Sequence, residues 1–218
     1  MTLLAIDTSS LACTVGVQAS GHVFERYEVL PREHTRLLLP MIHATLGEAG
    51  LSLGNLDAIV LGNGPGSFIG MRIGASVAQG LAYAAGLDIV PVSSLAAVAR
   101  RAGKPGDTVV VAQDAHMSQV YLGRYEIGPD RRPIALEPER LHSAQEPLAD
   151  SGLVVAGAGF EKYPELSPAS ARGVGSDCLY PRAADVLEIG AASFEEGGAI
   201  APERLEPAYL REEVAQKA

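Results

Sequence analysis

Residues 3–10, LLAIDTSS, begin with a short apolar run of β character that ends at Asp7 and continues into small hydroxyl residues. Two further runs of β character follow at 13–17 and 22–30, and Gly21 separates them as a turn residue. Short apolar runs bounded by turn residues are typical of neighbouring strands in one sheet. This part of the chain therefore predicts a three-stranded antiparallel meander.

Helices and strands alternate in the next part of the chain. Apolar residues at helical spacing predict a helix that ends at Ala49, before Gly50, and that either starts near Leu37 or kinks at Pro40. The segments expected after it are a strand at 58–61, a glycine-rich loop at 62–67, a helix from about 69 to 85, a strand at 89–92 and a helix at 94–101. This alternation predicts an α/β fold.

After the turn-forming residues 104–107 the same plan begins again, which indicates a duplicated fold. The similar segments are 109–114 and 3–7, 119–125 and 13–19, and 153–159 and 59–64, and a late helix is expected at 181–196. The repeat predicts an N-terminal lobe of residues 1–103, onto which a tail at about 203–218 packs back, and a C-terminal lobe of residues 104–202. Chance similarity between β-rich segments is the alternative explanation.

The charge of the chain argues against a protein that holds nucleic acid by itself. The 218 residues include 17 Lys and Arg against 26 Asp and Glu, which gives a net charge of −9. Long-range attraction to RNA or DNA requires a basic surface. The pairs Arg100-Arg101 and Arg131-Arg132 are interpreted as solvated side chains rather than binding sites. We therefore expect only weak, non-specific RNA binding by the lone chain.

We expect no signal peptide and no membrane span from this sequence. The N-terminus lacks the basic region of a secretory signal, and the longest uncharged stretch, between Arg72 and Asp88, is shorter than the ~20 residues of a membrane span. The two cysteines, Cys13 and Cys178, cannot form a disulfide framework and are expected in the core. We expect a cytoplasmic protein without a membrane segment.

Familiar catalytic motifs are incomplete. The five histidines do not have the spacing of a helical zinc pair, so no metal site is expected. Around Ser67, the glycines that a nucleophile elbow requires are replaced by Pro65 and Ile69. The loop at 62–67 also lacks the lysine of a P-loop and the third glycine of a dinucleotide fingerprint. No catalytic residue is therefore predicted.

A weak anion site is the binding site that the loops suggest. The junction of a strand, a glycine-rich turn and a helix start exposes backbone N–H groups that favour an anion. The candidate residues for this anion or for a nucleotide are Asp7, Gly64, Gly66 and Ser67. The structural alternatives are that the glycines only permit tight packing and that Asp7 caps the backbone of residues 8–10.

Small residues form a regular line in the helix expected at about 69–85. They recur at every fourth position, as Gly70, Gly74, Ala78 and Ala82. A second and larger apolar line, which includes Ile73, Val77 and Leu81, is expected to face the sheet. A soluble helix with two apolar faces is either internal or half of an interface, and we favour the interface because small side chains let another helix approach closely.

Five blocks of the sequence together resemble one protein family. They are 4–9 (LAIDTS), 33–35 (EHT), 64–74 (GPGSFIGMRIG), 114–115 (DA) and 207–211 (PAYLR). In this order they are similar to the bacterial tRNA threonylcarbamoyladenosine biosynthesis proteins of the TsaB family, over essentially the whole chain. The chain departs from the family pattern at Ile69, where threonine is usual, and at His116, where arginine is usual.

The resemblance implies the duplicated actin-like, sugar-kinase and Hsp70 ATPase (ASKHA) fold, with a mixed sheet flanked by helices in each lobe. It also implies a non-catalytic subunit that supports TsaD. In this family TsaD holds the metal and transfers threonylcarbamoyl to the adenosine beside the anticodon of tRNAs that read codons starting with A. A small ATPase, TsaE, joins the complex. Contact with tRNA is expected only through the complex, as is any ATP or ADP, and a homodimer is implied for the lone chain.

Two of the predicted helices are assigned to the contact with TsaD on steric grounds. Packed helices lie about 8–10 Å apart, and small residues reach the short end of that range. The residues expected in this interface are Leu38, Ile42, Thr45, Gly74, Ala78 and Ala82. The alternative functions are a sugar-kinase-like ATP-dependent phosphotransferase, a glycoprotease-like peptidase, and a structural protein that uses this helix only for a homodimer.

Overall fold

The predicted meander forms one side of a five-stranded sheet. In the computed structural model, which describes residues 1–149 and 151–211, strands β1 (Leu3–Asp7), β2 (Ala12–Ala19) and β3 (His22–Val29) pair antiparallel. Strands β4 (Ala58–Gly62) and β5 (Asp88–Val92) extend the sheet in parallel on the other side of β1. The resulting strand order is β3-β2-β1-β4-β5.

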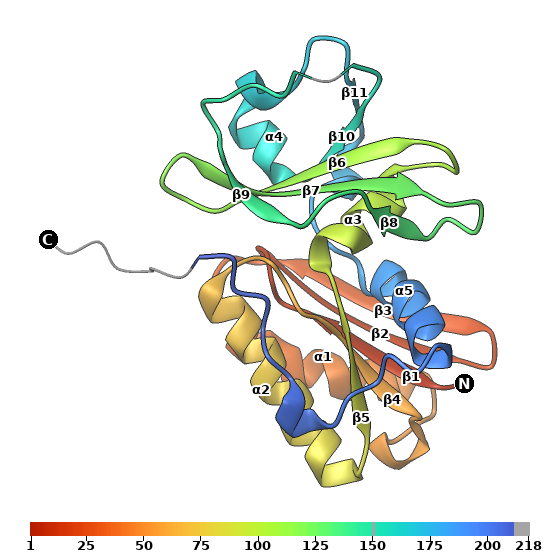
Figure 1. The fold of residues 1–218 in the computed structure, drawn as a ribbon. Helices are drawn as coiled ribbons and strands as arrows, with labels where there is room; N and C mark the ends of the chain where they lie inside the picture. Colours follow the sequence, from red (N-terminus) through yellow and green to blue (C-terminus); the bar gives the residue numbers. More distant parts are fainter. Residues whose placement is uncertain (150, 212–218) are drawn as a thin grey trace, which may run out of the picture.

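A second sheet repeats this plan. Its central strand, β6 (Thr108–Asp114), is antiparallel to β7 (Gln119–Ile127) and parallel to β10 (Val154–Ala156), just as β1 is to β2 and β4. The remaining strands are β8 (Pro133–Ala135), β9 (Arg140–Ser143) and β11 (Arg172–Gly173). The order β11-β10-β6-β7-β8, with β9 also on β7, confirms the predicted duplication and the two-lobed α/β fold (Figure 1).

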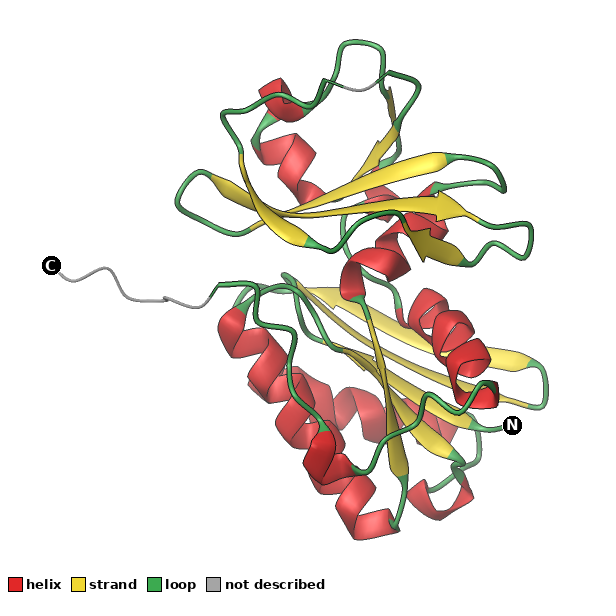
Figure 2. Ribbon diagram, in the orientation of Figure 1, coloured by secondary structure: helices red, strands yellow, loops and turns green. Residues whose placement is uncertain are grey.

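Strand β1 is buried on both faces, which explains its uninterrupted apolar sequence. Leu4 and Ile6 belong to the core beneath helices α1 (His34–Glu48) and α2 (Phe68–Ala85). Leu3 and Ala5 point to the opposite face and pack with residues of helix α5 (Ala183–Glu195). Figure 2 shows helices on both faces of this first sheet.

The ends of α1 and α2 follow from local sequence. Helix α1 begins at His34 and continues through Pro40, so of the two predicted alternatives the start near Leu37 is wrong. Helix α2 is capped by the Ser67 hydroxyl, which accepts a hydrogen bond from the Gly70 N–H at 3.2 Å. It ends before Gly86, whose φ of 66° is the left-handed conformation that glycine adopts without a Cβ penalty.

Two helices cover a sheet that the sequence did not assign to them. Helix α3 (Ser94–Ala102) follows the last strand of the first sheet but packs with its Leu95 and Val98 against β6 and β7 of the second sheet. Helix α5 comes from the end of the second half and covers the first sheet. Each of these two helices therefore packs across the predicted boundary between residues 1–103 and 104–202.

The described part of the C-terminal tail returns to the first lobe. Its 3₁₀ turn at Pro202–Arg204 contacts α2, and Leu205 is buried in the core beneath α1 and α2. The part of the predicted tail at 212–218 lies outside the described residues. The other short helices are α4 (Ala158–Lys162) and the 3₁₀ turns Leu53–Asn55, Pro164–Leu166 and Ser176–Cys178.

Candidate functional site

Asp7 ends β1 and is buried with both carboxylate oxygens in hydrogen bonds. Its Oδ1 accepts bonds from the backbone N–H and the hydroxyl of Ser9, each at 2.8 Å, and its Oδ2 accepts one from the Ser94 hydroxyl at 2.7 Å. Burial raises the pKa of Asp7, and the bonds from Ser94 and Ser9 offset only part of this rise. The carboxylate joins the β1–β2 turn to the start of α3.

The glycine-rich loop is brought to Asp7, as the sequence predicted, but its groups serve packing. A Cβ on Gly66 would overlap the carbonyl oxygen of Ser9, and the Gly64 N–H donates to the Ser94 hydroxyl at 3.1 Å. Ser67 caps α2 with its hydroxyl and donates its own N–H to the Ser9 carbonyl at 2.6 Å. This geometry favours the structural interpretation of Asp7, Gly64, Gly66 and Ser67 over the anion site.

The line of small residues in α2 faces this protein's own sheet and the turn after β1. A Cβ on Gly70 would overlap the carbonyl oxygen of Thr8, and a Cβ on Gly74 would lie 2.5 Å from the Thr8 hydroxyl oxygen. The Thr8 hydroxyl in turn donates to the Gly70 carbonyl at 2.7 Å. Small residues are needed here because α2 crosses the turn at very short range.

The structure places the residues predicted for the partner interface away from the open surface of the two helices, although Leu38 also lines the groove between them. Each of them is buried within the first lobe. Four of them belong to the hydrophobic core beneath α1 and α2, and one of these four, Leu38, also lines a groove between the helices; the six are Leu38, Ile42, Thr45, Gly74, Ala78 and Ala82.

An open groove lies between α1 and α2. Its volume is about 400 Å³, and Leu39 and Ile69 on its walls are 54% and 70% exposed. Its lining residues are Thr35, Leu38, Leu39, Phe68, Ile69, Arg72, Ile73, Ser76 and Val77. Ile73 and Val77, which were expected to face the sheet, are partly buried against the core and also line this groove.

Arg72 places one positive charge on this apolar groove. Its guanidinium carbon lies 3.7 Å from the centre of the Phe68 ring, and its Nε donates to the Tyr209 hydroxyl at 3.0 Å. The rings of Phe68 and Tyr209 are 5.5 Å apart. The sequence contained Tyr209 in the block 207–211, but nothing in that block indicated a contact with Arg72. The departure at Ile69 replaces a polar residue of the family pattern with an exposed apolar one in this groove.

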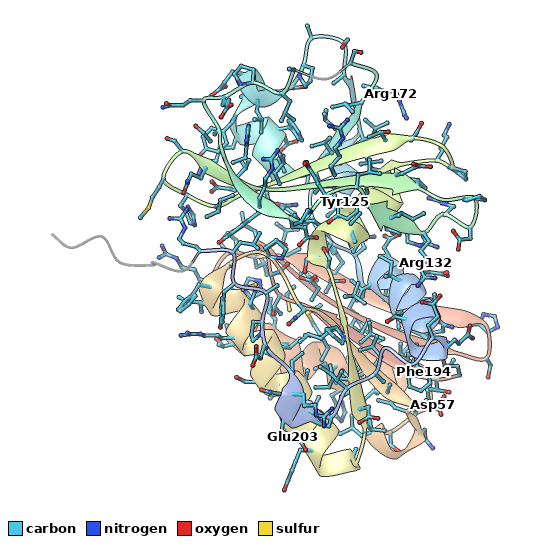
Figure 3. The ribbon with its side chains drawn as sticks, in the orientation of Figure 1. Asp57, Tyr125, Arg132, Arg172, Phe194 and Glu203 are labelled. Carbon is cyan, nitrogen blue, oxygen red and sulfur yellow. The ribbon has the colours of Figure 1, made fainter. Side chains whose placement is uncertain are left out.

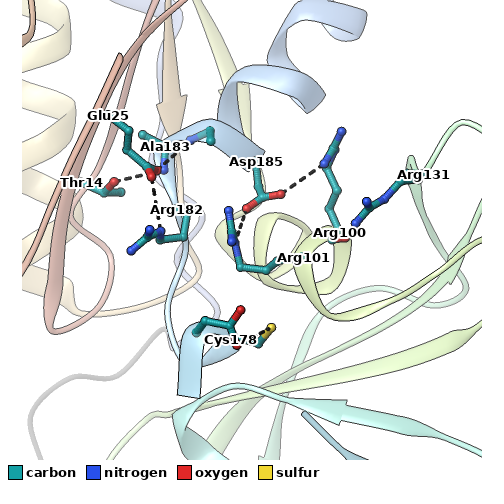
Figure 4. Close-up of polar contacts among 11 residues, drawn as sticks. Thr14, Glu25, Arg100, Arg101, Arg131, Cys178, Arg182, Ala183 and Asp185 are labelled. Atoms are coloured by element: carbon teal, nitrogen blue, oxygen red, sulfur yellow. Dashed lines mark hydrogen bonds and ion pairs between the residues drawn. The ribbon is translucent and has the colours of Figure 1, made fainter. Parts of the chain in front are cut away.

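Polar side chains hold the two lobes together. From α3, Arg101 and Arg100 reach the two carboxylate oxygens of Asp185 on α5, at 2.6 and 3.2 Å (Figure 4). The expectation that Arg100 and Arg101 are solvated is wrong, since their side chains are only 16% and 25% exposed. Tyr125, which Figure 3 labels at the meeting of the lobes, donates to Glu139 together with the Ser93 hydroxyl.

The second lobe contains the other departure from the family pattern. His116 lies in the β6–β7 turn with a φ of 61°, and its N–H donates to Asp114 at 3.0 Å. Asp114 also accepts a bond from Lys162 at 2.6 Å. Within residues 1–149 and 151–211, no three His, Cys, Asp or Glu side chains gather as a metal site, and no helix has the length and apolarity of a membrane span.

Comparison with known proteins gives consistent similarities over the whole chain. A family model described as TsaD, tRNA N6-adenosine threonylcarbamoyltransferase, matches residues 26–215. A protein of Escherichia coli K12 named tRNA threonylcarbamoyladenosine biosynthesis protein TsaB is 39% identical over 100% of this chain and 97% of its own length. The Haemophilus influenzae protein of the same name is 35% identical over 100% and 96%. The solved structure of YeaZ from Pseudomonas aeruginosa has a TM-score of 0.87 and 36% identity, and the match covers 96% of this chain and 99% of that one.

Proposed function

This chain belongs to the TsaB family of tRNA threonylcarbamoyladenosine biosynthesis proteins, and we propose that it serves this pathway as a non-catalytic subunit that binds TsaD. The observation that carries the proposal is the exposed apolar groove between α1 and α2. Large apolar side chains that remain exposed in a continuous groove favour a protein partner. The names of its relatives favour this function over the phosphotransferase and peptidase alternatives.

The shape of the groove supports a helical partner. Two neighbouring helices with a furrow between them accept the ridge of a third helix, at interaxial distances of about 8–10 Å. Leu39 and Ile69 form its two walls, and Arg72 adds a cation to its lining. We therefore expect TsaD to present an apolar helix face with a carboxylate near Arg72.

The proposed lack of catalysis rests on the residues around Asp7. The buried carboxylate is already bonded to Ser9 and Ser94, and Ser67 is engaged as a helix cap. We infer that the chain has no cofactor of its own and that ATP or ADP would bind only within the complex. The net charge of −9 supports contact with tRNA through the partner subunits, among them TsaE.

The exposed groove also favours self-association in the absence of TsaD, because a second copy would cover the same apolar surface. We place the protein in the cytoplasm, where tRNA modification would meet its substrate.

A reconstituted transfer reaction tests the proposed function. TsaD and TsaE from the same organism are supplied with tRNA, ATP and the threonylcarbamoyl donor, with and without this chain. We expect transfer only when TsaD and this chain are both present, and none with the chain alone. Transfer by the lone chain, or full transfer without it, would contradict the proposal.

A further inference from the structure

The segment Pro207–Arg211 runs from the first lobe to the second. Its start is fixed beside the glycine-rich loop, where the Asn63 side-chain amide donates to the Glu206 carbonyl at 2.9 Å and the Ala208 N–H donates to the Asn63 carbonyl at 3.1 Å. From there its two long side chains, Tyr209 and Arg211, contact different lobes.

Tyr209 supports the groove without lining it. Its ring packs against the Phe68 ring at an interplanar angle of 44°, and its hydroxyl accepts the hydrogen bond from Arg72. Phe68 and Arg72 both line the groove, and both are partly or fully exposed. An exposed arginine loses rotamer freedom when it binds a partner, and a contact that fixes it beforehand reduces this loss.

Arg211 fixes the other end of the segment on the β6–β7 turn of the second lobe. Its Nη2 donates to the Ala115 carbonyl at 3.0 Å and to the Gln119 side chain at 2.6 Å, and its Nη1 lies 2.9 Å from the Met117 sulfur. Three successive residues of this turn, His116, Met117 and Ser118, have φ values of 61°, 52° and 54°. Such a backbone is costly for residues with a side chain and persists only where surrounding contacts hold it.

We infer that Tyr209 is a positioning residue for the partner-binding groove and that the segment Pro207–Arg211 is a strap that couples this groove to the β6–β7 turn. This inference rests on the proposed binding of TsaD. Tyr209 holds Arg72 over Phe68, so that the single cation of the groove is already placed when TsaD arrives. Arg211 holds the strap in the second lobe and thereby holds Tyr209 in place.

Calorimetric titration of the full chain with TsaD tests the role of Tyr209. Tyr209→Phe removes the hydroxyl that binds Arg72 but keeps the ring, and we expect about fivefold weaker binding, the effect of losing one hydrogen bond. Tyr209→Ala removes ring and hydroxyl together and is expected to weaken binding about twentyfold. The control is Tyr163→Phe, which removes a tyrosine hydroxyl that lies 3.3 Å from Asp114 in the second lobe and should leave affinity unchanged.

A double-mutant cycle separates positioning from a general loss of structure. If Tyr209 acts through Arg72, then Tyr209→Phe has no further effect on affinity in an Arg72→Ala background. Fully additive effects, or a Tyr209→Ala variant that binds TsaD as tightly as the unaltered chain, would overturn the inference. If the unaltered chain itself does not bind TsaD, the proposed function fails. If it binds TsaD and substitution of Tyr209 does not change the affinity, only the inference about Tyr209 fails.

Amide hydrogen exchange tests the coupling to the second lobe. TsaD binding is expected to slow exchange in the turn Ala115–Gln119 of the unaltered chain. In Arg211→Ala this slowing should disappear, because the strap no longer reaches the turn. If exchange in the turn of the unaltered chain does not respond to TsaD, or if Arg211→Ala responds in the same way, the coupling is refuted.

Discussion

The Nε of Arg101 on α3 donates to the Asp185 carboxylate on α5 at 2.6 Å, and this bond joins a helix of the second sheet to a helix of the first. Arg100 binds the other carboxylate oxygen at 3.2 Å and also lies 3.2 Å from Glu188. The Asp185 side chain is only 6% exposed. A buried carboxylate shared by two arginines from another lobe restricts the angle between the lobes.

Removal of the charge at Asp185 should destabilise the fold. Asp185→Asn keeps the shape of the side chain but leaves Arg100 and Arg101 without their shared anion. We expect a loss of about 2–4 kcal/mol of unfolding free energy, since breaking one partner of a buried ion pair is costly. Urea denaturation measures it, with Glu196→Gln as control because the Arg132–Glu196 pair is exposed and should matter little. If the urea midpoint of Asp185→Asn equals that of the unaltered chain, the ion pairs of Asp185 do not stabilise the contact between the lobes.

The close approach of α2 to Thr8 predicts opposite effects for two glycines of one helix. Gly70→Ala would drive a Cβ into the Thr8 carbonyl, and we expect a loss of about 1–3 kcal/mol from overpacking. Gly80→Ala meets no atom within 4 Å and should stabilise the helix by about 0.5–1 kcal/mol. Thermal unfolding of both variants checks the pair, and destabilisation of equal size at both positions would contradict the observed orientation of α2.

Stability should depend on pH through Glu139. Burial raises the pKa of this carboxyl above its ordinary value of 4.5, and the hydroxyls of Ser93 and Tyr125 offset only part of the rise. The folded state then binds the proton more tightly than the unfolded chain, so this stabilisation is present below pH 4.5 and is lost as pH rises through the folded pKa. Glu139→Gln, which is always neutral, should gain stability relative to the unaltered chain as pH rises from 4.5 to 7.

Urea denaturation at several pH values measures this difference. Glu137→Gln removes one charge from the same loop and controls for net charge. A difference in unfolding free energy between the unaltered chain and Glu139→Gln that stays constant from pH 4.5 to 7 would refute the predicted effect of Glu139 on stability.

Most strands could be predicted from the sequence because their signals are local. Apolar runs with turn residues on either side marked β1, β2 and β4, and the recurrence of a run ending in aspartate at Asp114 revealed the second lobe. The positions of α3 and α5 could not be predicted in this way. An amphipathic pattern shows that a helix has a buried side but does not show which sheet that side covers.

The contacts of the candidate site could not be predicted for the same reason, because local patterns do not show which distant residues a side chain meets. The sequence predicted α1 and α2 as the partner helices and assigned the small residues of α2 to the partner, whereas the structure buries these small residues. The orientation of α2 is decided by Thr8, which bonds to Gly70 from 62 positions away. Tyr209 and Arg72 lie 137 positions apart in the sequence. No local pattern in the block 207–211 predicts the hydrogen bond between them.

One pair of arginine substitutions tests the central claim, that the exposed side of α2 binds TsaD while its small-residue side is core. Ser76 is exposed in the groove and Ala78, two positions away, is fully buried. Ala78→Arg should fail to fold, because it buries an unpaired charge in a packed core. Ser76→Arg should unfold within about 0.5 kcal/mol of the unaltered chain, as exposed substitutions usually do.

The deciding measurement is the TsaD affinity of folded Ser76→Arg, beside Ser170→Arg, the same substitution at an exposed turn of the second lobe. A long charged side chain in the groove should weaken TsaD binding about thirtyfold or more, since a charge buried unpaired at an interface costs at least about 2 kcal/mol, while Ser170→Arg should bind normally. Folded Ser76→Arg that binds TsaD as tightly as the unaltered chain would contradict the account.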